Sequence, residues 1–332
     1  MLDLQRLQRL NLVRRPLSHR FYGSLLHVNY RWFPGVELSF EDAERIPDEP
    51  VIFAMNHTDR YNYFPFQYLL WKTFDRFTAT WVKGKYYENG LLARFMESMF
   101  QLPTVSRGYL ITRDFVSVLG RMPTDQEYAL LRAAVDERAV GEAGTLPVPP
   151  DIPEMLLRKT RSPLGVTYDP ADADYADYIC ALFHAMMGRF VELNREARDI
   201  GLDLLVFPQG TRSIRLLPGH VGIAQMALAL EIPIVPIGCN GSDGVYPGSS
   251  PVGKQGRILY RVGDPIYYAD LAAYHIAEDW VPFSATAERD FAKPFKAVTE
   301  LVMDRIDPLL DLPYQRVRLA DVEEDRGADR FV

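Results

Sequence analysis

The chain has 332 residues, of which 48% are hydrophobic and 24% are charged, as in ordinary globular proteins. Its formal net charge of −7 argues against general nucleic-acid binding, which requires a basic surface. The two cysteines, Cys180 and Cys239, lie far apart without metal-ligand spacing, so the sequence predicts neither a disulfide framework nor a zinc site and favours a reducing cytosol.

The first 35 residues are basic and amphipathic. Apolar residues recur near helical spacing at Leu2, Leu7, Leu10 and Val13, arginines fill much of the remaining surface, and aromatic residues follow between Phe21 and Phe33. This pattern predicts a segment that lies in a membrane interface, and deletion of residues 1–15 should then release the protein from anionic vesicles. The alternative is a helix that docks on the core and exposes only its basic face.

No stretch approaches the ~20 consecutive apolar residues of a spanning helix. The sequence therefore predicts a soluble or monotopic protein, and we expect it in the cytoplasm, peripherally on the inner face of the cell membrane.

A buried strand is predicted over Val51–Met55, followed by Asn56-His57 and then by a helix from Tyr63 to Lys72. A histidine at the carboxyl end of a buried strand occupies the place where open α/β sheets bind ligands. His57 can also take a proton from a hydroxyl near neutral pH. Taken alone, a histidine in such a place is more often an ordinary hydrogen-bonded residue.

Two further strands are predicted over 78–82 and 102–106, with a helix over 86–100 between them. Lys83 and Lys85 come just after the first of these strands, and Arg107 ends the second. The planar fork of an arginine suits phosphate oxygens, so Arg107 is the better candidate ligand for a phosphate.

A helical insertion is predicted over about 108–201. Thr124 to Glu127 is a capping-box pattern that opens a helix through about Val140, and a long helix runs from Asp169-Pro170 to Gly201. The insertion could cover the active site, shape an acyl tunnel or bind a partner. Methionines and phenylalanines on the long helix fit a plain core as well as an acyl-chain lining.

The run Leu204–Phe207 is another short buried strand, and it ends in Pro208-Gln209-Gly210-Thr211-Arg212-Ser213. Backbone N–H groups at Gly210 and Thr211, together with the guanidinium of Arg212, suit a phosphate or a developing oxyanion. A third apolar strand follows over 232–237, and a further strand over 256–264.

Read in order, the histidine block, the strand ending in Arg107, the Phe-Pro-Gln-Gly-Thr-Arg-Ser block, Leu217-Pro218 followed by Gly222, and the Ile-Pro-Ile-Val-Pro-Ile strand resemble the PlsC-type glycerolipid acyltransferases. The resemblance to this glycerol-3-phosphate and lysophosphatidate acyltransferase family spans roughly residues 50–238. It implies that His57 acts as a general base on an acceptor hydroxyl, which attacks an acyl thioester. It also implies that Lys85, Arg107 and Arg212 lie near the acceptor's phosphate.

Two charged positions of the family's motifs differ here. Asn62 stands where the family has the aspartate that supports the histidine, and Gln209 stands where it has a glutamate. In the serine-protease version of such a pair, losing the carboxylate costs roughly 10⁴ in kcat. Asp59 is a possible substitute partner for His57, although two residues along a helix point its side chain away, and it also fits a first-turn acid that the helix dipole favours.

The sequence thus predicts an α/β protein with a mainly parallel sheet flanked by helices. Its parts are an N-terminal membrane-interface segment (1–35), an acyltransferase-like domain (36–320) with the insertion, and a tail (321–332). The predicted activity is transfer of a fatty acyl group from acyl-CoA or acyl carrier protein to a glycerol-3-phosphate or lysophospholipid type of acceptor, with no metal or organic cofactor. The predicted site comprises His57, Asn62 and Asp59 as catalytic residues and Lys85, Arg107, Gln209, Gly210, Thr211 and Arg212 as substrate ligands. Two alternatives remain open: a different lipid or natural-product acceptor, and a lipid- or acyl-binding pseudoenzyme.

Overall fold

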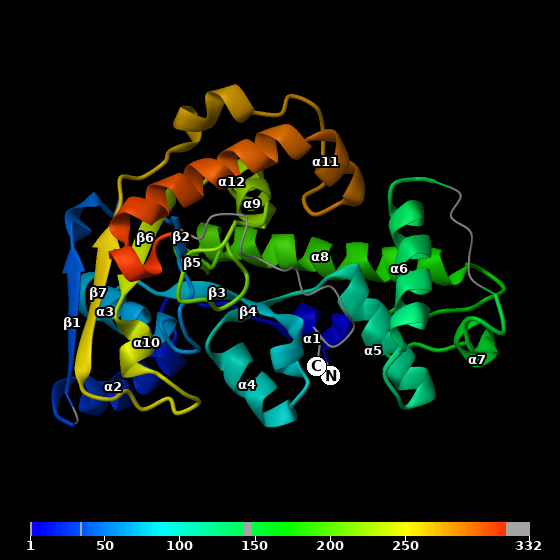
Figure 1. The fold of residues 1–332 in the computed structure, drawn as a ribbon, viewed down its shortest axis with the longest axis horizontal. Coiled ribbons are helices and arrows are strands. Elements are labelled where there is room, and N and C mark those ends of the chain that lie inside the picture. The colour runs from blue at the N-terminus through cyan, green and yellow to red at the C-terminus, as the bar shows by residue number, and fades with distance from the viewer. Residues whose placement is uncertain (1, 34, 143–147, 317–332) are drawn as a thin grey trace.

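A seven-stranded sheet organises the structure, a computed structural model that describes residues 2–33, 35–142 and 148–316 (Figure 1). The strands are β1 (Val36–Glu41), β2 (Ile52–Met55), β3 (Thr78–Lys83), β4 (Gln101–Thr104), β5 (Asp203–Val206), β6 (Ile234–Asn240) and β7 (Gly256–Val262). Their order is β1-β7-β6-β2-β5-β3-β4. The five strands from β6 to β4 are parallel to one another, and only the β6–β7 pair is antiparallel. The predicted fold class, a mainly parallel sheet flanked by helices, is confirmed.

Helices cover both faces of the sheet because its central strands are apolar on both. The helices are α1 (Leu4–Arg9), α2 (Leu17–Arg31), α3 (Tyr63–Phe74), α4 (Gly90–Ser98), α5 (Arg107–Leu119), α6 (Asp125–Ala139), α7 (Glu154–Arg158), α8 (Tyr175–Asp199), α9 (Gly222–Leu230), α10 (Ser242–Val245), α11 (Ala285–Asp290) and α12 (Ala292–Ile306). Along β2, Ile52 and Ala54 join a core cluster with α8, α9 and α12, whereas Phe53 and Met55 join a second cluster with α2, α3 and α10. This alternation is the period of two that a strand imposes.

The predicted insertion consists of α5 to α8, which extend beyond the sheet (Figure 1). The capping box that opens α6 is confirmed, since the Thr124 and Glu127 side chains cap each other's backbone N–H groups. The long helix, α8, begins six residues later than Asp169 because Asp174 is its N-cap. A buried ion pair between Asp114 and Arg161, with an O–N distance of 2.6 Å, ties α5 to the chain after α7.

The N-terminal prediction is wrong in one respect. The chain forms a six-residue helix, α1, and Leu2 and Leu7 are completely buried in the core cluster that includes α8. These leucines therefore fit the core-docking alternative, and deletion of residues 1–15 would open the core. The exposed apolar face belongs to the next helix, α2. The tail over 321–332 lies outside the described residues.

His19 on α2 is a buried histidine with a pH-dependent effect on stability. Its ring packs against Phe77 and Phe100, with centroid distances of 6.0 and 5.1 Å. Burial lowers the pKa of His19 to about 4. Because the unfolded chain binds this proton more tightly, the stabilisation is fully present above pH ~6.5 and is lost as the pH falls toward 4.

We expect the free energy of unfolding of the wild type to fall more between pH 7 and 4.5 than that of His19→Gln, by about 2–3 kcal/mol. Urea denaturation at both pH values measures this difference. The exposed His275 provides the control, since His275→Gln should keep the pH dependence of the wild type. Equal pH dependence in wild type and His19→Gln would show that this proton is not coupled to folding.

Candidate active site

Three neighbouring strands end at the same edge of the sheet and deliver the polar residues of the candidate site. β2 leads to His57, β5 leads to the loop 207–213, and β3 ends at Lys83. Since β5 pairs with both β2 and β3, these three strand ends are adjacent. The carboxyl edge of a parallel sheet is where ligands bind in open α/β folds.

His57 is held by Asn62. The His57 Nδ1 atom lies 3.2 Å from Asn62 Oδ1, and Asn62 is completely buried. The Asn62 Nδ2 group donates to the backbone oxygen of Asn56 at 2.9 Å, which fixes the amide orientation and leaves Oδ1 as the acceptor toward the ring. His57 therefore carries its proton on Nδ1, and the lone pair on Nε2 is available for a substrate.

The imidazole is a neutral base. It stacks on Phe207 with ring centroids 4.1 Å apart. Burial lowers the pKa of His57 to about 4, the bond to Asn62 opposes this shift, and the positive charges of Arg212 and Lys83 add to it. At neutral pH the ring is thus unprotonated, and none of the carboxylates in the described part of the chain bonds to it to stabilise an imidazolium.

Asp59 does not replace the missing carboxylate. Its Oδ2 accepts from the Thr58 hydroxyl at 2.9 Å and its Oδ1 from the Tyr61 backbone N–H at 2.8 Å. Asp59 precedes α3 by four residues, so it is not the first-turn acid that the sequence also suggested. The buried carboxylate instead shapes the loop between β2 and α3, and burial raises its pKa.

Gln209 joins the two loops of the site. Its Nε2 donates to the backbone oxygens of Thr211 at 2.8 Å and of His57 at 3.3 Å. A glutamate here would press a carboxylate against two carbonyl oxygens, so the amide suits this geometry better than a carboxylate would. The Oε1 atom is buried without a hydrogen-bond partner among the described residues and can accept from a ligand hydroxyl.

The backbone N–H groups predicted to bind an oxyanion are engaged within the turn itself. Gly210 donates to Phe207 O at 2.9 Å, and Thr211 donates to Gln209 O at 2.7 Å in a γ-turn centred on Gly210. The Gly210 φ of 63° and the nearby ring of His220, 2.8 Å from where a Cβ would lie, both require glycine. These two donors are therefore occupied in this conformation.

The cations of the site come from β3 and the loop after β5. Arg212 is exposed and forms no ion pair within the described part of the chain. Lys83 Nζ lies 3.4 Å from the Thr211 hydroxyl. Its positive charge and that of Arg212 both lower the pKa of the His57 imidazole. Lys85, which the resemblance implies near a phosphate, belongs to the 3₁₀ turn after β3, and its role stays a prediction.

Arg107 lies apart from this group. β4 is two strands from β5, so roughly 10 Å separate the two strand ends. The Arg107 Nε donates to Asp136 Oδ1 at 3.1 Å, and its guanidinium lies 4.9 Å from the centre of the Phe183 ring. Residues of α6 and α8 in the insertion thus hold Arg107, and the two-arginine clamp stays a prediction.

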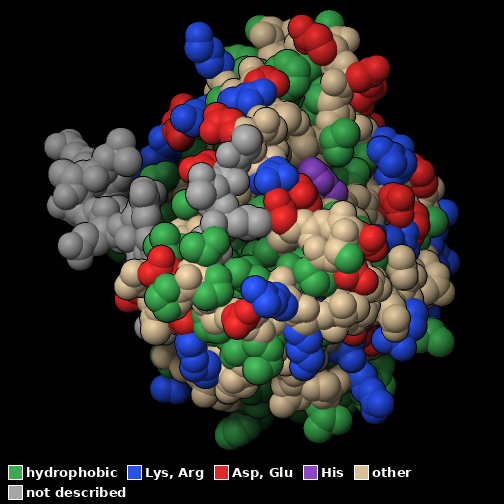
Figure 2. Space-filling view, turned by 90° about the vertical axis from the view of Figure 1, so that its right-hand side faces the viewer, with side chains coloured by type: hydrophobic (Ala, Val, Ile, Leu, Met, Phe, Trp, Pro, Cys, Tyr) green, Lys and Arg blue, Asp and Glu red, His purple; other side chains and the backbone are tan. Residues whose placement is uncertain are grey.

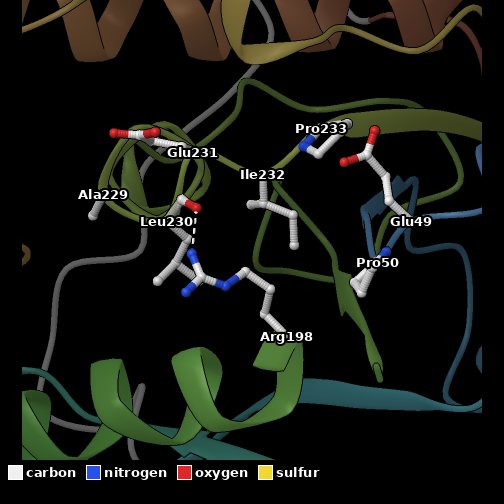
Figure 3. Close-up of a pocket in the computed structure, with 8 residues that line it drawn as sticks. All are labelled: Glu49, Pro50, Arg198, Ala229, Leu230, Glu231, Ile232 and Pro233. Atoms are coloured by element: carbon white, nitrogen blue, oxygen red, sulfur yellow. Dashed lines mark hydrogen bonds between the residues drawn. The ribbon is translucent and has the colours of Figure 1, made fainter. Parts of the chain in front are cut away.

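A small depression of about 390 Å³ lies at the opposite edge of the sheet (Figure 3). It is lined by Pro50 and Pro233, which precede β2 and β6, and by Arg198, whose guanidinium donates to Leu230 O at 2.7 Å. It is remote from His57. No group of histidine, cysteine or acidic side chains placed to hold a metal ion occurs among the described residues.

Comparisons with known proteins assign no family to the chain. No protein-family model matches it, and no curated protein matches its sequence. Among solved structures it is similar to the 1-acyl-sn-glycerophosphate (LPA) acyltransferase PlsC from Thermotoga maritima, with 13% sequence identity, a TM-score of 0.39, and coverage of 91% of this chain and 80% of that chain.

Proposed function

We propose that the protein is an acyltransferase that moves a fatty acyl group from a thioester, acyl-CoA or acyl carrier protein, to a hydroxyl of a glycerol-3-phosphate or lysophospholipid type of acceptor. The observation that carries this proposal is the oriented His57–Asn62 pair at the carboxyl edge of the sheet. It leaves an unprotonated Nε2 beside two cations, and it requires no metal or organic cofactor.

The reaction follows from this geometry. His57 Nε2 takes the proton of the acceptor hydroxyl as its oxygen attacks the thioester carbonyl. The tetrahedral intermediate then collapses, the C–S bond breaks, and the imidazolium returns the proton to the departing thiolate. Arg212 and Lys83 are positioned to bind the acceptor's phosphate, and Gln209 Oε1 to accept from a second hydroxyl.

Release of free thiol from palmitoyl-CoA, with and without glycerol-3-phosphate or lysophosphatidate, tests the proposal. Thiol release that depends on an acceptor supports it. Palmitoyl-CoA that binds without turnover would favour the pseudoenzyme, which the uncharged Asn62 makes the main alternative. Turnover only with an acceptor that lacks phosphate would assign the enzyme to a different lipid or natural-product alcohol.

The membrane contact we propose is the outer face of α2. Leu17, Phe21 and Trp32 are 77, 60 and 70% exposed, and Leu25 and Val28 complete the stripe at helical spacing. Arg20 and Arg31 flank it, and no acidic residue occurs between Asp3 and Glu37. Apolar side chains with flanking arginines are the composition of helices that lie in an anionic membrane surface.

Helix α4 extends this apolar face. Its Phe95 packs against Tyr22 of α2 with ring centroids 5.0 Å apart, and Leu91, one turn earlier, is exposed. Figure 1 places α2 and α4 on the same side of the molecule, and Figure 2 shows hydrophobic side chains protruding on that lower side. None of the described helices has the length and apolar character needed to cross a membrane.

The double variant Phe21→Ser/Trp32→Ser should bind anionic vesicles at least about tenfold more weakly, because burial of each aromatic ring contributes about 1.5–3 kcal/mol. Co-sedimentation with phosphatidylglycerol-containing vesicles measures this. Leu312 is equally exposed but lies outside α2 and α4, so Leu312→Ser should bind like the wild type. Unchanged binding of the double variant would place the contact elsewhere.

A further inference from the structure

A groove of about 770 Å³ lies between α8 and the segment 278–291, which contains α11 (Figure 1). Its volume is within the size range of small-molecule sites. The lining includes no residue of the loops 57–62 and 207–213 that form the candidate active site. The groove is therefore a second concave surface whose ligand is to be argued from its own side chains.

Aromatic side chains form much of the wall of the groove. Trp280 and Phe291 both line it, and both pack on Phe295 of α12, with ring centroids 5.1 and 6.3 Å apart. Phe283 also lines it and packs on Trp81 of β3 at 6.2 Å. Each ring is thus anchored on another aromatic residue, so the wall is formed before a ligand binds. Trp280 and Phe291 are only half-buried, which leaves part of each ring accessible.

Acidic side chains make the groove negative. Glu278, Asp279 and Asp290 line it, and none of the other described residues of the lining is a lysine or an arginine. Asp290 is paired with Arg289, whose Nε lies 2.7 Å from Oδ1. Glu278 and Asp279 are exposed and form no ion pair within the described part of the chain. His184, which also lines the groove, is neutral at pH 7 because burial lowers its pKa.

This lining favours an organic cation over a metal ion or an anion. Since no described set of histidine, cysteine or acidic side chains is placed to hold a metal ion, these carboxylates do not converge on one point. Asp279 is the sequence neighbour of Trp280, and in the same way Asp290 precedes Phe291. Carboxylates next to accessible aromatic rings attract an ammonium group through both ion pairing and the cation–π interaction. The same carboxylates repel a phosphate or a carboxylate ligand.

We propose that the groove is a second ligand site, which binds an organic ammonium ion with an apolar body. The ammonium group pairs with Glu278 and Asp279 next to the Trp280 ring. The apolar body lies against Met187 of α8 and Phe283, which are 4 and 8% exposed and form the apolar floor of the groove. This site does not depend on the proposed acyl transfer.

Three probes with the same apolar body and different charges test the proposal. Phenylbutylamine is a cation at pH 7, phenylbutanol is neutral and phenylbutyrate is an anion. We expect the wild type to bind the amine at least about fivefold more tightly than the alcohol, within the range that an exposed ion pair and a cation–π contact provide together. The anion should bind most weakly. Ligand-observed NMR titrations at low ionic strength measure the three Kd values.

The double variant Glu278→Gln/Asp279→Asn should bind phenylbutylamine no more tightly than phenylbutanol, and its affinity for the alcohol should be unchanged. Asp48→Asn/Glu49→Gln is the matched control, because it removes the same two charges from neighbouring exposed acids outside the groove. It should keep the wild-type preference for the amine. Thermal melts of both variants check the fold.

Several results would overturn the proposal. One is a wild type that binds none of the probes, or that binds the amine and the alcohol equally well. Another is a preference that survives in Glu278→Gln/Asp279→Asn, or one that Asp48→Asn/Glu49→Gln loses as well, since the overall charge would then be its cause. His57→Gln should bind phenylbutylamine like the wild type, and weaker binding by this variant would move the amine to the candidate active site.

Discussion

Replacement of His57 by glutamine is expected to reduce acceptor-dependent thiol release by at least about 10³-fold, within the range that general-base catalysis contributes. The variant keeps a polar side chain of similar reach but has no nitrogen lone pair at the position of Nε2. Binding of palmitoyl-CoA should persist, because the substitution removes only the base and leaves the other side chains of the site in place. Thiol release and palmitoyl-CoA binding are measured on the same preparation.

His275→Gln is the matched control for this prediction. His275 is exposed, stacks on Tyr268 and lies in the 3₁₀ segment after β7, outside the candidate site. It should retain wild-type activity. If His57→Gln kept more than about a tenth of the wild-type rate, a loss smaller than general-base catalysis provides, His57 would not be the base.

The sheet could be predicted from the sequence because its central strands are buried on both faces. Such strands appear as short continuous apolar runs, as at Val51–Met55 and Leu204–Phe207, and each run is bounded by polar or turn-forming residues. No single apolar run determines the order of the strands in the sheet. It depends on which strands pair across the chain, and so the antiparallel β7 and the position of β4 at the edge became known only from the structure.

The site residues differ in the same way: some lie together because they are close in the sequence, and others depend on the order of the strands. His57 and Asn62 are five residues apart in one loop, so their proximity is a local property of the sequence. Arg107 follows β4 and Arg212 follows β5, and β3 lies between these two strands in the sheet, so their relative position depends on strand order. The resemblance does not distinguish Lys83 from Lys85, and the structure places Lys83 at the end of β3.

The N-terminal segment shows a second limit of prediction from the sequence alone. A stripe of leucines has the same spacing whether its partner is a membrane or another helix, and only the fold supplies the partner. The apolar stripe of α1 is buried in the core and that of α2 is exposed, although both segments are rich in arginine.

The substitution Asn62→Asp, which introduces the acid of the acyltransferases that the sequence resembles, should raise the rate and lower the stability. A carboxylate next to Nδ1 stabilises the imidazolium that forms during the reaction, and the neutral amide cannot. We expect kcat to rise at least about tenfold at pH 7, against an upper limit of about 10⁴ set by the corresponding protease substitution. We also expect the pKa of His57 to rise from about 4, because the new negative charge favours the charged ring.

The same substitution has a structural cost. Asn62 Nδ2 donates to Asn56 O, and an aspartate oxygen would face that carbonyl oxygen instead, in a completely buried position. Loss of this bond should reduce the free energy of unfolding by about 1–3 kcal/mol. Asn240→Asp is a matched control, because buried Asn240 likewise donates its Nδ2 to a backbone oxygen, that of Leu309, and lies outside the candidate site. It should lose stability without gaining activity.

The pH dependence of kcat/KM separates the effect of Asn62→Asp on the reaction from its effect on stability. In the wild type the base form of His57 persists until the pH falls toward 4, so the acid limb should lie near that value. In Asn62→Asp this limb should move upward by about one unit or more, since one unit corresponds to 1.36 kcal/mol of interaction between carboxylate and imidazolium. A variant that folds, keeps its acid limb near 4 and shows no faster turnover would mean that the charge at position 62 does not limit the reaction. The rate would then be limited by another step, such as release of the acylated product.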